Sequence, residues 1–258
     1  MTDSLLAEHA EIFDEVARHL ASARRILFIT GAGISADSGL PTYRGIGGLY
    51  NGGLTEEGIR IEDALSGDML AIRPDITWKY LAQIEHNCRD AGPNDAHRAI
   101  ARLEAEFASV LVFTQNIDGL HQQAGSRNVI PIHGDVHRLE CLHCGTQETV
   151  DSLENRELPP ICPNCGEEMR PQVVLFGEML PEAAISRFYD ELEKGFDLVF
   201  SIGTTSVFPY IAQPVVWAAR AGIPTVEINP SETRVTPYVA YKIELGAAAA
   251  MNALLERL

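Results

Sequence analysis

Four of the five cysteines form two C-x2-C pairs with 17 residues between them: Cys141 with Cys144, and Cys162 with Cys165. This spacing is typical of a tetrahedral zinc site, and the glycine that follows each pair lets the backbone fold back tightly. Four thiolates leave no open position for water, so we expect one structural Zn²⁺ that takes no part in catalysis. We interpret His143 as a bystander and Cys88 as a half-buried helix residue.

A glycine-rich turn is the second candidate for chemistry. The apolar run 26–29 ends in Thr30, and G-A-G-I-S-A follows at residues 31–36. A strand, glycines and a helix start together present backbone N–H groups to a diphosphate, so the turn predicts a dinucleotide site. A tight turn that holds no ligand is the plain alternative. No acidic residue ends an apolar run about 20 residues later, which argues against an ordinary dehydrogenase.

Polar side chains follow two further apolar runs. Residues 110–113 lead into Q-N-I-D at 115–118, and residues 129–132 end in His133. A polar residue at one such position more often bonds its own backbone than acts in catalysis. Because ligands of open α/β sheets bind at the carboxyl ends of the strands, two polar strand ends beside a phosphate turn favour a catalytic site.

The elements that position these residues alternate along the chain. Helical spacing occurs over 5–20, 94–107, 181–195 and 209–222, and short apolar runs lie at 26–29, 110–113, 129–132, 198–202 and 225–228. The alternation predicts an α/β fold with a mostly parallel sheet and helices on both faces. Residues 36–90 and 137–170 interrupt it. We predict a large domain from residues 1–35, 91–136 and 171–258, and a small domain from the two interruptions.

Bulk composition limits the classes of function. The 258 residues are 46% hydrophobic and 22% charged, which is typical of a globular protein. Lys plus Arg number 20 and Asp plus Glu 36, and the net charge of −16 argues against a nucleic-acid binder. Neither a secretory signal nor a run of roughly 20 apolar residues is visible. We therefore expect a cytoplasmic protein that binds neither nucleic acid nor membrane, and the sequence assigns no oligomeric state.

Taken together, these motifs resemble the sirtuins, the Sir2-like NAD-dependent protein deacylases, in their bacterial form. The glycine turn, Q-N-I-D, H-G, the paired C-x2-C and F-G-E at 176–178 occur in the order and spacing of that family over about residues 20–250. The resemblance implies a Rossmann-like large domain. It also implies a small domain that combines a zinc ribbon (137–170) with a cofactor loop and helical module (36–90). NAD and acyl-lysine are expected to meet between the two.

The resemblance also assigns residues by position. The expected NAD contacts are Gly31, Ala32, Gly33, Ser35, Tyr43, Arg44, Gln115, Asn116, Ile117, Asp118, Gly203, Thr204, Ser206 and Asn229. The expected catalytic residues are His133, Asn116 and Asp118. The expected clamp on the substrate backbone, which would add the peptide as a strand, consists of Val174, Phe176, Gly177, Glu178 and Val207.

The activity that the resemblance implies is removal of acyl groups, acetyl above all, from lysines of peptide or protein substrates. NAD loses nicotinamide, the acyl oxygen attacks the ribose, and His133 acts as general base through the ribose hydroxyls. The products are free lysine, nicotinamide and O-acyl-ADP-ribose. Protein mono-ADP-ribosyl transfer is one alternative, and a catalytically idle NAD-binding or zinc-ribbon interaction module is another.

Three departures from the family pattern refine this expectation. Thr42 stands where many sirtuins have Asp, and the loop 203–209 is one residue shorter than the common form. Desuccinylating sirtuins pair the acyl carboxylate with Tyr-x-x-Arg. The nearest segment here runs from Tyr80 to Gln83, with Gln in place of Arg. We therefore expect neutral acyl groups as substrates.

Overall fold

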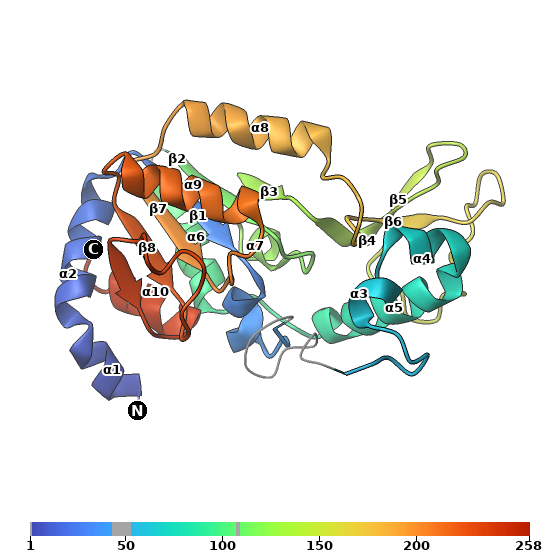
Figure 1. Ribbon diagram of the computed structural model, residues 1–258, viewed down its shortest axis with the longest axis horizontal. Helices are drawn as coiled ribbons and strands as arrows, with labels where there is room; N and C mark the ends of the chain where they lie inside the picture. Colours follow the sequence, from blue (N-terminus) through green and yellow to red (C-terminus); the bar gives the residue numbers. More distant parts are fainter. Residues whose placement is uncertain (1, 43–52, 107–108) are drawn as a thin grey trace.

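The computed structural model describes residues 2–42, 53–106 and 109–258. Its larger part contains a six-stranded parallel sheet in the order β3-β2-β1-β7-β8-β9 (Figure 1). The strands are β1 (Arg25–Thr30), β2 (Ser109–Thr114), β3 (Val129–Pro131), β7 (Leu198–Ile202), β8 (Thr225–Ile228) and β9 (Tyr241–Ile243). The predicted parallel α/β sheet is confirmed, with β9 as an unpredicted edge strand.

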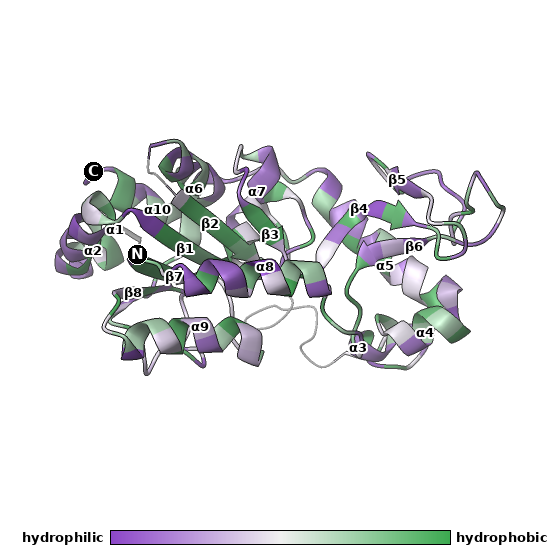
Figure 2. Ribbon diagram, turned by 90° about the horizontal axis from the view of Figure 1, so that it is seen from above, coloured by the Kyte–Doolittle hydropathy of each residue, from purple (hydrophilic) through white to green (hydrophobic). Residues whose placement is uncertain are grey.

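Helices cover both faces of this sheet. Alternate residues of β1 point to opposite faces, so Ile26 and Phe28 pack on one side and Leu27 and Ile29 on the other. The first side is covered by α2 (Ala10–Ser22), α6 (Asp95–Glu106) and α10 (Ala247–Leu255), and the second by α8 (Glu182–Glu193) and α9 (Pro209–Arg220). Because both faces are buried, the strands are almost entirely apolar, and they are mostly green in Figure 2.

Two details of the predicted helices differ. The helix expected over 5–20 is divided at His9 into α1 (Thr2–Glu8) and α2, and the His9 ring bonds the Leu5 carbonyl at 2.8 Å. Phe107, expected on the buried face of α6, lies outside the described residues. The ends of α8 and α9 are as predicted, since Gly195 and Gly222 take the left-handed conformation just after them.

A second part of the molecule lies beyond the carboxyl end of β3 (Figure 1). It has a three-stranded antiparallel sheet of β4 (Gly134–Glu140), β5 (Gln147–Thr149) and β6 (Arg170–Val173), with β4 in the middle. Beside it lie α3 (Ile61–Ala64), α4 (Gly67–Ile72) and α5 (Pro74–Arg89). Residues from the helices and from this sheet share one apolar core, in which Trp78 and Leu139 are completely buried. The domain bounds given above stay a prediction.

A buried ion pair joins α5 to this small sheet. Glu85 has no exposed surface, and its carboxylate accepts a 2.7 Å bond from Arg89 one helical turn away. The His137 ring on β4 lies 3.6 Å from the same carboxylate. A buried charge needs such partners, so α5 and β4 are held in register. Among the described residues, no helix combines the length and the apolar character that crossing a bilayer requires.

Candidate active site

A cavity of about 570 Å³ lies at the carboxyl edge of the six-stranded sheet. The residues that follow five of its strands line it: Gly31, Ala32 and Gly33 after β1, Gln115, Asn116 and Ile117 after β2, His133 after β3, Gly203 and Thr204 after β7, and Asn229 after β8. Val174, Phe176, Gly177 and Glu178, which follow β6, line the opposite side. The structure thus brings most of the predicted site residues around one space.

Five predicted residues do not line this cavity. Ser35 and Asp118 border a smaller adjoining pocket, which Asn116 and Ile117 also line. Ser206 is buried in a left-handed conformation at φ 53°, and Val207 is 40% exposed. Tyr43 and Arg44 lie outside the described residues.

The glycine turn is interlocked with the loop after β7. The Gly33 N–H donates to the Gly203 carbonyl at 2.8 Å, and a Cβ on Gly33 would lie 2.6 Å from the Gly203 Cα. Gly203 itself has φ +61°, and a Cβ there would lie 2.3 Å from the Ile34 nitrogen. Both positions therefore require glycine. The predicted helix start after the turn is a 3-10 helix, η1 (Ala32–Ser38).

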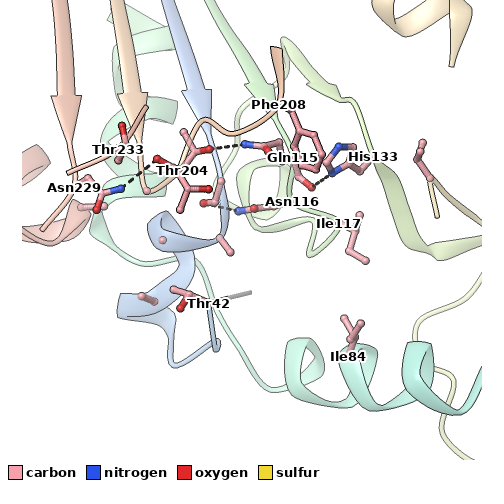
Figure 3. A pocket seen from close by; sticks show the side chains of 18 of the residues that line it. Thr42, Ile84, Gln115, Asn116, Ile117, His133, Thr204, Phe208, Asn229 and Thr233 are labelled. Atoms are coloured by element: carbon pink, nitrogen blue, oxygen red, sulfur yellow. Dashed lines mark hydrogen bonds between the residues drawn. The ribbon is translucent and has the colours of Figure 1, made fainter. Parts of the chain in front are cut away.

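Side-chain hydrogen bonds connect three strand ends along the floor of the cavity (Figure 3). Gln115 Nε2 donates to the Thr204 hydroxyl at 2.8 Å, and Asn229 Nδ2 donates to the Thr204 carbonyl at 3.3 Å. Thr204 also accepts a bond from the Ser206 N–H, which turns the loop back toward the sheet. The ends of β2, β7 and β8 are thereby held at fixed distances from one another.

A second network surrounds the buried carboxyl of Asp118. Asn116 Nδ2 donates to the Ser35 hydroxyl at 3.2 Å, and that hydroxyl donates to Asp118 Oδ2 at 2.7 Å. The Leu120 N–H donates to the other carboxyl oxygen. Burial raises the pKa of Asp118, although the bonds from Leu120 and Ser35 partly oppose the shift. An acceptor-rich group in a small closed pocket suits a ligand that presents N–H donors.

His133 is held by both ring nitrogens. Nδ1 lies 3.0 Å from the Gln115 carbonyl, and Nε2 lies 2.7 Å from the Tyr210 hydroxyl. Burial lowers the pKa of His133 to about 4, so the ring is neutral at pH 7. Because a carbonyl only accepts hydrogen bonds, the single ring proton is on Nδ1 and Nε2 carries the lone pair. An imidazole with a neutral nitrogen at a cavity wall can act as a general base.

The four paired cysteines are brought together as predicted. Their sulfur atoms all lie within 4.8 Å of one another. Tetrahedral coordination at about 2.3 Å places sulfurs about 3.8 Å apart, so the set fits Zn²⁺. Gly145 and Gly166 have positive φ, and their N–H groups bond the carbonyls of Cys141 and Cys162, so each pair closes in the tight turn expected. His143 is exposed.

Comparison with known proteins adds independent information. The model of the Sir2 family matches residues 31–209. The chain belongs to the Sir2 family. It is 52% identical to the NAD-dependent protein deacylase 2 of Pseudomonas aeruginosa, over 88% of this chain and 90% of the relative. It is 48% identical to the protein of the same name in Pseudomonas syringae pv. tomato, over 95% and 99%.

Solved Sir2 structures have the same fold. A Sir2 homologue in complex with NAD superposes with a TM-score of 0.83 at 36% identity, covering 94% of this chain and 92% of that one. A mutant Sir2 homologue bound to 2′-O-acetyl ADP ribose gives 0.84 at 35%, covering 94% of each. A Sir2 complex with a p53 peptide and NAD⁺ gives 0.80 at 30%, covering 94% and 96%. The Rossmann-like fold that the sirtuin resemblance implied is therefore confirmed.

The structure corrects the expected position of the acyl-selecting residues in this Sir2 protein. Gln83 is exposed, and the Tyr80 hydroxyl is bonded to Glu57 at 2.5 Å. Leu81 and Ile84, on the face of α5 turned toward the sheet, line the cavity instead, and Figure 3 shows Ile84 facing it. The earlier assignment matched the nearest tyrosine by letter, whereas the helix period decides which side chains face inward.

Sequence reasoning missed further residues at the site. Phe208 and Tyr210 flank Pro209 at the start of α9 and line the cavity beside His133. An aromatic pair around a helix-starting proline was the available signal. Cys88 was expected to be half-buried, but it is 8% exposed and borders the smaller pocket, where burial raises the pKa of its thiol to about 12. It is therefore a poor nucleophile, as predicted.

Proposed function

We propose that this chain is an NAD-dependent protein deacylase that removes neutral acyl groups, acetyl first among them, from lysine side chains. The observation that carries the proposal is the neutral His133 on the wall of the cavity that the glycine turn and Gln115 also line. The names of the Pseudomonas relatives and the NAD and peptide complexes of related Sir2 structures support it.

The glycine turn and the strand ends hold the cosubstrate. Bound NAD supplies the ribose carbon that loses nicotinamide and accepts the acyl oxygen. Backbone groups of Gly31–Gly33 and the loop 203–206 bind the diphosphate, and Asn229 binds the adenosine ribose. Ile117 and Asp118 hold the carboxamide, since the Asp118 carboxyl borders a small pocket that accepts N–H donors. Gln115 and Asn116 position the nicotinamide ribose.

His133 moves the proton. Its Nε2 accepts a proton from a ribose hydroxyl so that this oxygen attacks the acyl carbon, while Nδ1 stays bonded to the Gln115 carbonyl. That carbonyl holds the ring orientation and stabilises the imidazolium as it forms. The low pKa of His133 keeps Nε2 unprotonated before the reaction begins.

The segment after β6 and the loop after β7 bind the substrate peptide. The backbone of Phe176 is already paired, because its N–H donates to the Leu65 carbonyl and its carbonyl accepts from Gly67. We therefore assign Phe176 a side-chain contact and place the added strand beside Val174, Gly177 and Val207. Glu178 braces the segment through two 2.9 Å bonds from Arg170.

The acyl chain enters the apolar side of the cavity. Leu81 and Ile84 on α5 present no charge there, and Leu175 adds a third aliphatic group. A carboxylate-bearing acyl group would lose its water without gaining a cationic partner, which is unfavourable. One structural Zn²⁺ at the four cysteines holds the ribbon and has no part in these steps.

The test is the variant His133→Ala, with the exposed histidine variant His86→Ala as matched control. Loss of a general base lowers the rate by about 10² to 10⁴. We expect that loss in peptide deacetylation for His133→Ala, with zinc content and NAD binding unchanged, and full activity for the control. Turnover near that of the wild type in His133→Ala removes the residue from the mechanism.

A further inference from the structure

Tyr210 lies at the second position of α9, and its side chain contacts the proposed base. The tyrosine ring stacks on Phe208, with centroids 5.5 Å apart and planes 14° apart. Both rings meet the His133 imidazole edge-on, at 6.1 and 6.2 Å between centroids. Pro209 begins the helix between them and fixes the backbone direction there. The imidazole is thus enclosed by two aromatic rings that α9 holds in place.

The direction of the Tyr210 bond follows from the protons available. The Gln115 carbonyl takes the only proton of the neutral imidazole, on Nδ1. Nε2 is then an acceptor, so over the 2.7 Å contact the Tyr210 hydroxyl donates. The lone pair that His133 needs as a base is therefore already engaged by a hydroxyl of the protein.

We propose that Tyr210 is a positioning residue that caps Nε2 of His133 until a substrate hydroxyl takes its place. This inference rests on the proposed function, because it assumes that His133 is the base. Since Tyr210 and His133 both line the cavity, a ribose hydroxyl that reaches Nε2 meets the phenol there. The cap satisfies a largely covered nitrogen in the resting enzyme and is exchanged, hydroxyl for hydroxyl, when the cavity fills.

The experiment measures how readily diethyl pyrocarbonate acylates His133, because this reagent attacks an imidazole nitrogen with a free lone pair. Tyr210→Phe keeps the ring between Phe208 and His133 and removes only the hydroxyl. Peptide mass spectrometry on the full metallated chain gives the rate at His133 relative to the exposed His86. We expect the relative rate to rise about 2- to 10-fold, the factor that one ordinary hydrogen bond supplies.

Two controls make the result specific. Tyr189→Phe removes the hydroxyl of an exposed tyrosine on α8 and leaves the relative rate at His133 unchanged. The completely buried His97 reports loosening of the fold. Equal rates at His133 in Tyr210→Phe and the wild type overturn the cap, and so does a parallel rise at His97.

Deacetylation by Tyr210→Phe provides a second readout. The Gln115 carbonyl and the aromatic edges still orient His133, so we expect kcat to stay within about threefold of the wild type. A fall of 10² or more with the fold intact overturns the capping role, because Tyr210 then transfers the proton itself. The labelling assay needs no turnover. A wild type that never deacylates therefore contradicts the proposed function alone.

Discussion

The contact between Gly33 and Gly203 provides a sharp test of how the cofactor turn is built. A Cβ on Gly33 would lie 2.6 Å from the Gly203 Cα and 2.7 Å from its carbonyl oxygen, about 0.8 Å short of ordinary contact. Both obstacles are backbone atoms, so no side chain can move aside. Gly33→Ala therefore pushes the turn and the loop after β7 apart and weakens the 2.8 Å bond between them.

The magnitude follows from these two effects. Overpacking costs about 1–3 kcal/mol and the weakened bond about 1 kcal/mol, so we expect a loss of about 2–4 kcal/mol. For a chain of this size each kcal/mol lowers Tm by about 2–4 °C, which gives a fall of roughly 5–15 °C. A displacement of about 1 Å costs up to about 10² in rate, so kcat/KM for NAD falls roughly 10- to 100-fold.

Gly92→Ala is the matched control. Nothing lies within 4 Å of a Cβ built there, and the residue is exposed. It gains about 0.4–1 kcal/mol, because alanine reduces the freedom of the unfolded chain. Thermal unfolding and steady-state kinetics with varied NAD compare the two variants. If Gly33→Ala unfolds with Gly92→Ala and keeps its kcat/KM, the interlock does not exist.

Three further predictions concern the metal, the buried histidines and the acyl group. Removal of zinc by a chelator lowers Tm by more than about 5 °C, because Cys141 and Cys162 are part of the core shared with α5; metal-free protein with an unchanged Tm contradicts this. Burial lowers the pKa of His97 to about 4, so folding stability falls as pH drops from about 6.5 to 4. His97→Gln reduces that slope by about 1.4 kcal/mol per pH unit in urea titrations, and equal slopes would refute the assignment. Acetyl-lysine peptide is processed faster than succinyl-lysine peptide, and Ile84→Arg narrows the difference; a wild-type preference for succinyl overturns the neutral pocket.

Most of the large sheet was predictable because its strands are buried on both faces. Continuous apolar residues such as 26–29 and 198–202 have no other stable place in a globular protein of this size. The missed strand β9 is an edge strand in which only Ile243 is fully buried, so no apolar run marks it. The break at His9 was missed because apolar residues keep helical spacing across it.

The site was predictable where one motif carries one role. The glycine turn, the Gln115–Asp118 segment and His133 follow strands, and a parallel sheet brings strand ends to one edge. Contacts between distant segments leave no trace in local spacing. The bond between His133 and Tyr210 joins residues 77 positions apart, and the inward face of α5 depends on how that helix packs against β4.

The central claim is that this chain couples cleavage of NAD to transfer of an acyl group from lysine. The most direct measurement is mass spectrometry of the products when the zinc-loaded protein is given NAD and an acetyl-lysine peptide. We predict equal amounts of deacetylated peptide, nicotinamide and O-acetyl-ADP-ribose. Free acetate formed without nicotinamide, or nicotinamide formed with no change in the peptide, contradicts the claim.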